Sequence, residues 1–153
     1  MRWRTHGPVI ALTVAAAFGA QAADVAGVWK TAGDGGLIRI EACGEAICGR
    51  IAASSPEDAA QRDIHNRNPA LRTRPIVGLL IMKLSPIGPQ RWGNGWIYNP
   101  DDGHSYRASV ALGGDGRLRL KGCLVGPLCR TQTWIRAGGF AGREPPATAP
   151  SSN

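Results

Sequence analysis

Residues 104–123 have the sequence HSYRASVALGGDGRLRLKGC, in which apolar side chains recur at every second position on either side of a glycine-rich turn. This period of two is typical of β-strands that place one face on a core and the other in solvent. The stretch therefore predicts a β-hairpin, and its apolar inner face comprises Tyr106, Ala108, Val110, Leu112, Leu118 and Leu120. Arg107, Ser109, Arg117, Arg119 and Lys121 occupy outward positions.

Short alternating runs continue along the chain on both sides of this hairpin, and 21 glycines and 11 prolines supply frequent turns. Outside the N-terminal segment, no apolar stripe of helical period is long enough to predict a long helix. We predict strands over residues 27–31, 36–43, 47–53, 76–84, 90–98, 104–112, 116–123 and 129–136. About eight strands with mostly short connections indicate an all-β fold, an antiparallel up-and-down barrel.

The segment WGNGWIYNPDDGHSYRA, residues 92–108, has two interpretations. If Tyr98 lies opposite Tyr106, residues 101–103 form a hairpin loop after Pro100, and the aspartates are turn formers. Alternatively, His104 and a neighbouring aspartate serve a hydrolase or isomerase. No paired base, oxyanion device, calcium-loop spacing or nucleotide-binding glycine loop accompanies them. We therefore predict no catalytic residues, no metal site and no cofactor.

Aromatic side chains mark the predicted inner face of the barrel. In the strand over residues 90–98, Trp92, Trp96 and Tyr98 are expected on one side, continued by Tyr106 and Trp134 on later strands. A small barrel either fills its interior or holds one small ligand. These aromatics are thus either core residues or the lining of a pocket for an apolar or amphipathic molecule, and the sequence leaves both interpretations open.

Four cysteines in a chain that we predict to be exported indicate disulfides. Metal ligation is the rival interpretation, but the spacings C-x4-C and C-x5-C lack the histidine partners of a zinc site. Antiparallel pairing sets Cys43 opposite Cys48 and Cys123 opposite Cys129, which predicts two local disulfides that fix hairpin register. Free thiols or a long-range pairing, such as Cys43 with Cys123, are the alternatives.

The two ends of the chain differ from the predicted barrel. Residues 1–22 combine Arg2 and Arg4 with an apolar run and an A-x-A pattern, which predicts a signal peptide and a periplasmic or secreted protein. Its removal lowers the formal net charge from +7 to +5 and leaves one barrel domain over residues 23–136. Residues 137–153 predict a disordered tail. We expect no transmembrane segment and no nucleic-acid partner.

The long connection over residues 54–75 is rich in arginine and suggests a functional or mobile loop. Arg67, Arg72 and Arg74 are candidates for binding a carboxylate or phosphate head while the barrel takes an apolar tail. We predict that the barrel binds a small apolar or amphipathic ligand in the periplasm. In an alternative function, a solid-core protein uses these arginines to contact anionic envelope lipid or a partner protein. A purely structural interpretation has them bond loop carbonyls.

Two features resemble the lipocalin and calycin barrels: a G-x-W sequence, GVW at residues 27–29, and a late arginine in TWIR, residues 133–136. The resemblance implies that Arg136 packs over Trp29 and closes one end of the barrel. The chain also resembles the small exported bacterial proteins of domain-of-unknown-function family 2147, through GVWKT (27–31), NRNPALRTRPIVGL (66–79), GWIYNPDDGHSYRA (95–108), LRLKGC (118–123) and CRTQTWIR (129–136). This family implies a lipocalin-like fold and brings no catalytic residues.

Overall fold

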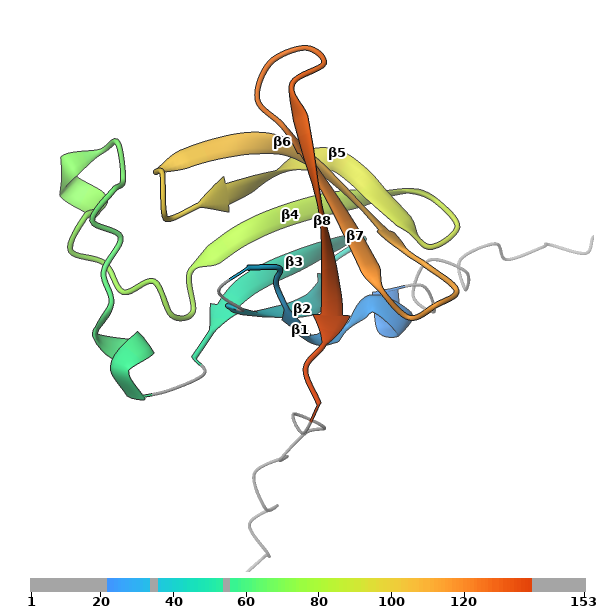
Figure 1. Ribbon diagram of the computed structural model, residues 1–153, viewed down its shortest axis with the longest axis horizontal. Helices are drawn as coiled ribbons and strands as arrows, with labels where there is room; N and C mark the ends of the chain where they lie inside the picture. The colour runs from blue at the N-terminus through green and yellow to red at the C-terminus, as the bar shows by residue number, and fades with distance from the viewer. Residues whose placement is uncertain (1–21, 34–35, 54–55, 139–153) are drawn as a thin grey trace, which may run out of the picture.

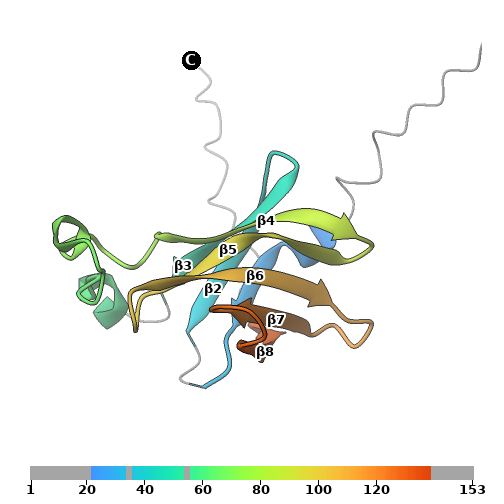
Figure 2. The ribbon, with the colours of Figure 1, turned by 90° about the horizontal axis from the view of Figure 1, so that it is seen from above.

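A computed structural model describes residues 22–33, 36–53 and 56–138 of the chain. The predicted cleavage segment up to residue 21 and the predicted tail from residue 139 lie outside the described residues. Eight antiparallel strands follow in chain order and close into a barrel, because the last strand pairs with the first (Figures 1 and 2). They are β1 (Gly27–Lys30), β2 (Leu37–Cys43), β3 (Ala46–Ala52), β4 (Leu80–Gly88), β5 (Arg91–Asn99), β6 (His104–Leu112), β7 (Leu118–Cys123) and β8 (Cys129–Arg136).

The up-and-down order gives the barrel two different ends. At the closed end, residues 22–25 form a helical turn before β1, near the short turns that join β4 to β5 and β6 to β7. At the open end lie the β5–β6 and β7–β8 turns and the long connection between β3 and β4. This connection carries two short 3-10 helices, η1 (Pro56–Ala60) and η2 (Pro69–Leu71). No helix within the described ranges has the length and apolar character needed to cross a membrane.

Apolar packing fills the closed end. Val25 and Trp29 are completely buried, and the Trp29 Nε1 donates a hydrogen bond to the Val25 carbonyl oxygen at 2.9 Å. The Arg136 guanidinium lies over the Trp29 ring, 4.5 Å from its centroid, and donates to the carbonyl oxygens of Ala26 and Asp24. Gly27 has φ of +133°, and a Cβ there would lie 2.8 Å from Arg136 Nη1, so the arginine needs this glycine beside it.

Both predicted disulfides are present, but the first hairpin has a different register from the one predicted. Cys123 lies directly opposite Cys129, as predicted, and the two are bonded. Cys43 is bonded to Cys48 although it lies opposite Ala46. The tight turn after Cys43, with Gly44 at φ of +69°, sets this pairing. The slip of two positions preserves which face each side chain occupies.

The strand predictions fail at two places. β4 begins at Leu80 rather than Ile76, because residues 76–79 turn at Gly78, where φ is +80°. In β5, Tyr98 pairs with Ser105 and Ile97 pairs with Tyr106, so the predicted pairing of Tyr98 with Tyr106 is wrong by one residue. The loop after Asn99 accordingly has four residues, Pro100 to Gly103, and Gly103 has φ of +70°.

Candidate functional site

A cavity of about 1100 Å³ enters the barrel from its open end. Its inner wall is apolar and includes Ile38, Ile51, Ile81, Ile97 and Trp134. Polar side chains gather toward the rim, among them Tyr106, Arg130, Gln132 and Asp102. This volume slightly exceeds that of typical small-molecule sites, which are mostly apolar with a few convergent polar groups. The open end is therefore the candidate functional site.

One inward position on β7, beside the cavity, carries no side chain. Gly122 lies opposite Ala108, and a Cβ there would meet only the Tyr106 Cβ at 3.9 Å and the Ile97 Cγ2 at 4.0 Å. Gly49 differs, since a Cβ at that position would lie 3.0 Å from the Met82 Cε. Met82 thus fills the space beside Gly49, whereas the space beside Gly122 belongs to the cavity.

The aromatic residues proposed for the pocket divide between three environments. Tyr106, Trp134 and part of Tyr98 line the cavity, whereas Trp92 is 1% exposed within the core. Trp96 lies on the outer surface, which corrects the prediction that it shares a face with Trp92. The cause is a β-bulge between Trp92 and Gly95, with Asn94 at φ of +51°, which inverts the inward and outward positions along the rest of β5.

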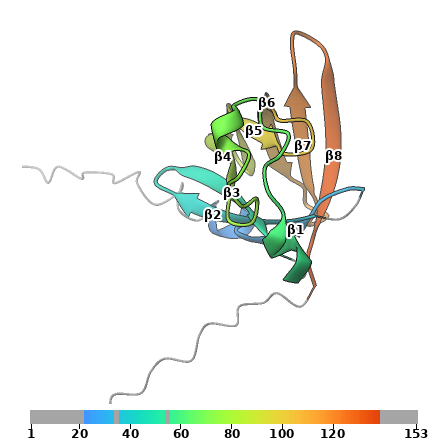
Figure 3. The ribbon, with the colours of Figure 1, turned by 90° about the vertical axis from the view of Figure 1, so that its left-hand side faces the viewer.

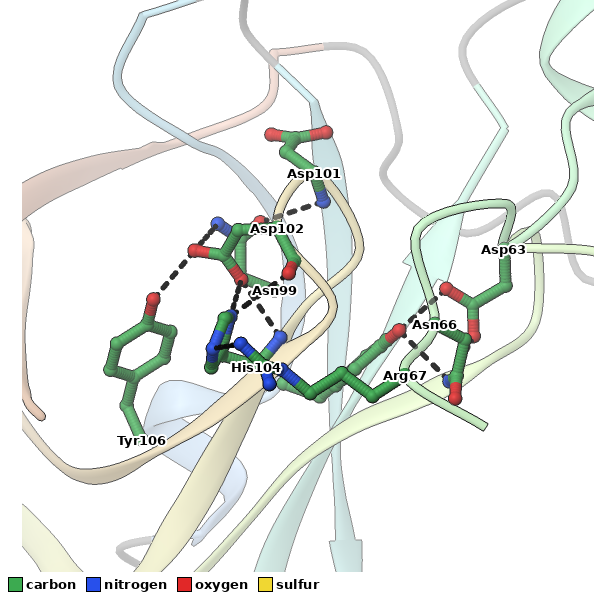
Figure 4. Close-up of polar contacts among 9 residues, drawn as sticks. Asp63, Asn66, Arg67, Asn99, Asp101, Asp102, His104 and Tyr106 are labelled. Carbon is green, nitrogen blue, oxygen red and sulfur yellow. Dashed lines mark hydrogen bonds and ion pairs between the residues drawn. The ribbon is translucent and has the colours of Figure 1, made fainter. Parts of the chain in front are cut away.

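The same inversion turns Tyr98 toward the long β3–β4 connection. Its hydroxyl donates to Asp63 Oδ1 at 2.6 Å and accepts from Asn66 Nδ2 at 3.0 Å. Asp63 has no solvent exposure, and its other oxygen accepts from Asn66 Nδ2 at 2.8 Å and pairs with Arg74 at 2.8 Å. The connection is consequently fixed to the barrel by a buried polar network that sequence reasoning did not identify (Figure 4).

Asp63 and Tyr98 both have shifted pKa values in this network. Burial alone would raise the pKa of Asp63, but hydrogen bonds from Tyr98, Asn66 and Arg74 and the Arg74 charge outweigh it and hold that pKa below its usual value. Burial and the adjacent Asp63 carboxylate raise the pKa of Tyr98. The charged carboxylate and the neutral phenol are therefore the forms that the fold stabilises.

The three loop arginines bond within the protein. Arg74 pairs with Asp63, Arg72 Nε donates to the Asn66 carbonyl oxygen at 2.8 Å, and Arg67 contacts His104 Nε2. These bonds agree with the structural interpretation in which they hold the connection in place. They give less support to the alternative in which this loop contacts envelope lipid or a partner protein.

A second polar cluster surrounds Asp102 at the rim. Its carboxylate accepts from Tyr106 Oη at 2.5 Å, Asn99 Nδ2 at 3.0 Å and the His104 backbone NH at 2.9 Å (Figure 4). Burial would raise the pKa of Asp102, but these hydrogen bonds hold it below its usual value, while the bond to Asp102 raises the pKa of Tyr106. The aspartate thus orders the turn, as the sequence predicted for a turn former.

His104 has both ring nitrogens occupied. Arg67 has only donors, so His104 Nε2 accepts, and Nδ1 donates to the Asp102 carbonyl oxygen at 2.9 Å. A general base requires a free lone pair directed at a substrate proton, which this arrangement does not provide. Among the described residues, no group of three His, Cys, Asp or Glu side chains could hold a metal ion.

Arg130 was not predicted as a site residue. It lies opposite Gly122, lines the cavity, and has neither a hydrogen bond nor an ion pair with any residue that the structure describes. Asp58, Asp101 and Asp102 also line this cavity, so the rim carries both signs of charge. The predicted strand pairing could have identified Arg130, because it lies an even number of residues from Trp134 on the same strand. Its side chain is therefore expected on the same inward face.

Comparison with known proteins places the chain in a family and a fold. Residues 27–136 match the family model described as "Uncharacterized protein conserved in bacteria (DUF2147)". Protein HP1028 from Helicobacter pylori, described as belonging to the lipocalin family, has a similar structure, with a TM-score of 0.67 and 23% sequence identity over 75% of this chain and 84% of that one. No curated protein matches the chain. The chain belongs to the DUF2147 family and forms a lipocalin-like barrel.

Proposed function

We propose that this DUF2147 barrel binds a small amphipathic molecule in its open cavity and acts outside the cytoplasm as a binding protein rather than an enzyme. One observation carries the proposal: the barrel interior is packed at its closed end but left open beside Gly122, where Ile97 and Trp134 form an apolar wall. An apolar part of a ligand fits this wall, and a polar head fits the rim.

The mixed charge of the rim defines the expected head group. Arg130 offers donors, while Asp101 offers a carboxylate whose oxygens lie away from the other polar groups in Figure 4. Such a rim suits a hydroxylated or zwitterionic head better than a head with a single charge. An anionic head would be repelled by the rim aspartates, and a cationic head would be repelled by Arg130. The two disulfides support a location in an oxidising compartment.

The proposal is tested with N-phenyl-1-naphthylamine, an uncharged apolar fluorophore, followed by displacement with alcohols, acids and amines of equal chain length. We expect saturable binding to the unaltered protein. Gly122→Leu should weaken it, because the new side chain extends into the cavity, and the free energy of unfolding should not fall, since the Cβ position is free of clashes.

The matched control is Thr131→Leu, which adds a similar side chain on the exposed outer face of the neighbouring strand. It should leave the affinity for the fluorophore unchanged. Saturable binding that persists in Gly122→Leu with undiminished affinity would remove the cavity as the site, and absence of binding by the unaltered protein would reject the proposal.

A further inference from the structure

The β7–β8 hairpin ends in an exposed apolar tip, LVGPL, residues 124–128. Leu124, Val125 and Leu128 are 53%, 69% and 69% exposed, which places three adjoining large apolar side chains in solvent. The disulfide between Cys123 and Cys129 joins the two strands directly below this tip. Figures 1 and 3 show the hairpin extending beyond the rest of the barrel. Such exposure at a fixed protrusion requires an explanation other than loop flexibility.

A row of outward side chains leads from the tip across the sheet. Lys83 lies opposite Trp96, Trp96 opposite Arg107, and Arg107 opposite Cys123. Trp96 is 37% exposed and forms a shallow groove with Arg107, Lys121 and Gly126. An exposed tryptophan between cations, next to protruding aliphatic residues, has the chemistry of a protein that lies in a lipid–water interface.

The charge of this side of the barrel is strongly asymmetric. Strands β4 to β8 contain two lysines and five arginines and no aspartate or glutamate. Of the outward cations, Lys83, Arg107 and Lys121 lie closest to the groove and have no ion pair within the described part of the chain. This surface is complementary to a negatively charged sheet of head groups.

We propose that this hairpin tip, residues 124–128, docks the protein on an anionic lipid bilayer, with Trp96, Arg107 and Lys121 at the head-group level. A bilayer fits better than a protein partner, because a stable protein interface buries about 800 Å² on each side, whereas this tip is a narrow convex loop. Leu124, Pro127 and Leu128 also line the rim of the large cavity. Docking therefore brings the cavity mouth to the membrane, and, if the proposed function holds, the amphipathic ligand comes from that membrane.

Docking is measured by co-sedimentation of the protein, as processed by an expressing bacterium, with vesicles. One set contains phosphatidylcholine alone, and the other contains phosphatidylcholine and phosphatidylglycerol in equal parts. We expect binding to the anionic vesicles that weakens as salt is raised. Arg107→Ser with Lys121→Ser should weaken it about 25-fold, at about fivefold for each cation. The control pair, Arg39→Ser with Arg91→Ser, removes two exposed cations outside the row and should change it less.

The apolar part of the contact is tested with Val125→Asp, because Val125 is exposed and lines neither the cavity nor the groove. It should weaken vesicle binding at least about tenfold. The matched control is Ile64→Asp, at a β-branched residue that is 61% exposed on the β3–β4 connection. Brominated lipid should quench tryptophan fluorescence in the unaltered protein and much less in Trp96→Phe.

Two results would overturn docking by the tip. One is equal binding of Val125→Asp and the unaltered protein to anionic vesicles, and the other is no binding of the unaltered protein to either kind of vesicle. The same variants are assayed for the fluorophore. Val125→Asp should retain cavity binding, so a failure of docking and a failure of the proposed function give separate results.

Discussion

The two ends of the barrel are stabilised by different forces. At the closed end, Trp29 and Ile40 are at most 1% exposed, and Arg136 covers the tryptophan face. At the open end, a cavity lies beside Gly122, and the adjoining connection is fixed by hydrogen bonds to Asp63. The difference shows how one small barrel combines a stable fold with a binding space: apolar packing is concentrated away from the mouth, and polar bonds hold the mouth's surroundings in shape.

The largest contrast is expected between two isoleucines that face the interior at opposite ends. Ile40→Ala leaves a void in the packed end and should lower the free energy of unfolding by about 3 kcal/mol. Ile97→Ala only enlarges an existing cavity, so its cost should be about 1 kcal/mol. Chemical denaturation followed by circular dichroism measures both. Equal losses would mean that the two ends are packed alike.

Asp63→Asn tests whether hydrogen bonds hold the β3–β4 connection at the open end. The variant keeps the size of the side chain but replaces a carboxylate oxygen by a donor and removes the partner of Arg74. Loss of this buried network should cost about 2 kcal/mol and release the β3–β4 connection, as followed by amide hydrogen exchange over residues 61–76. Asp115→Asn removes an exposed pair with Arg119 and should change exchange there very little. Unchanged protection in Asp63→Asn would show that the connection is held by something else.

Acid should weaken the open end before the closed end. The pKa of Asp63 is lower in the folded protein than its usual value. Its contribution to the free energy of unfolding is therefore fully present above about pH 4. It is lost as pH falls through the lower folded-state pKa, because the unfolded chain then binds the proton more readily. Amide hydrogen exchange in residues 61–76 should become faster over this pH range, while the fluorescence of Trp29 stays that of the folded protein. The open-end effect should be absent from Asp63→Asn, and an identical acid response in that variant would assign it to other carboxylates.

The parts of the fold that were predictable follow a regular period. The β6–β7 hairpin places Val110 opposite Leu120, and β7–β8 places Leu118 opposite Trp134, as uninterrupted alternation requires. The pair of Trp29 and Arg136 also meets as the family resemblance implied. In a strand without a β-bulge, the sequence alone is enough to predict which face each side chain occupies.

The candidate site was harder to predict because it depends on departures from that period. The bulge at Asn94 sends Trp96 to the outer surface, and only the surrounding Gly93 and Gly95 hinted at an irregularity. Asp63 lies in a connection without periodicity, so nothing in its neighbourhood predicted a contact with Tyr98 across 35 positions. Long-range pairing of loops is decided by packing that local sequence does not record.

The smallest effect is expected from two arginines on the same strand, one toward each end. Arg136 donates to two carbonyl oxygens and stacks on Trp29, so Arg136→Lys should lose the planar contact and about 1 kcal/mol of unfolding free energy. Arg130 makes no such bonds within the described residues, and Arg130→Lys should cost less than about 0.5 kcal/mol. Instead, Arg130→Lys should change how well acids displace the fluorophore compared with alcohols, because Arg130 faces the cavity rim. Thermal unfolding and the displacement assay together separate the roles, and a stability loss in Arg130→Lys equal to that in Arg136→Lys would remove the distinction between a closing arginine and a binding one.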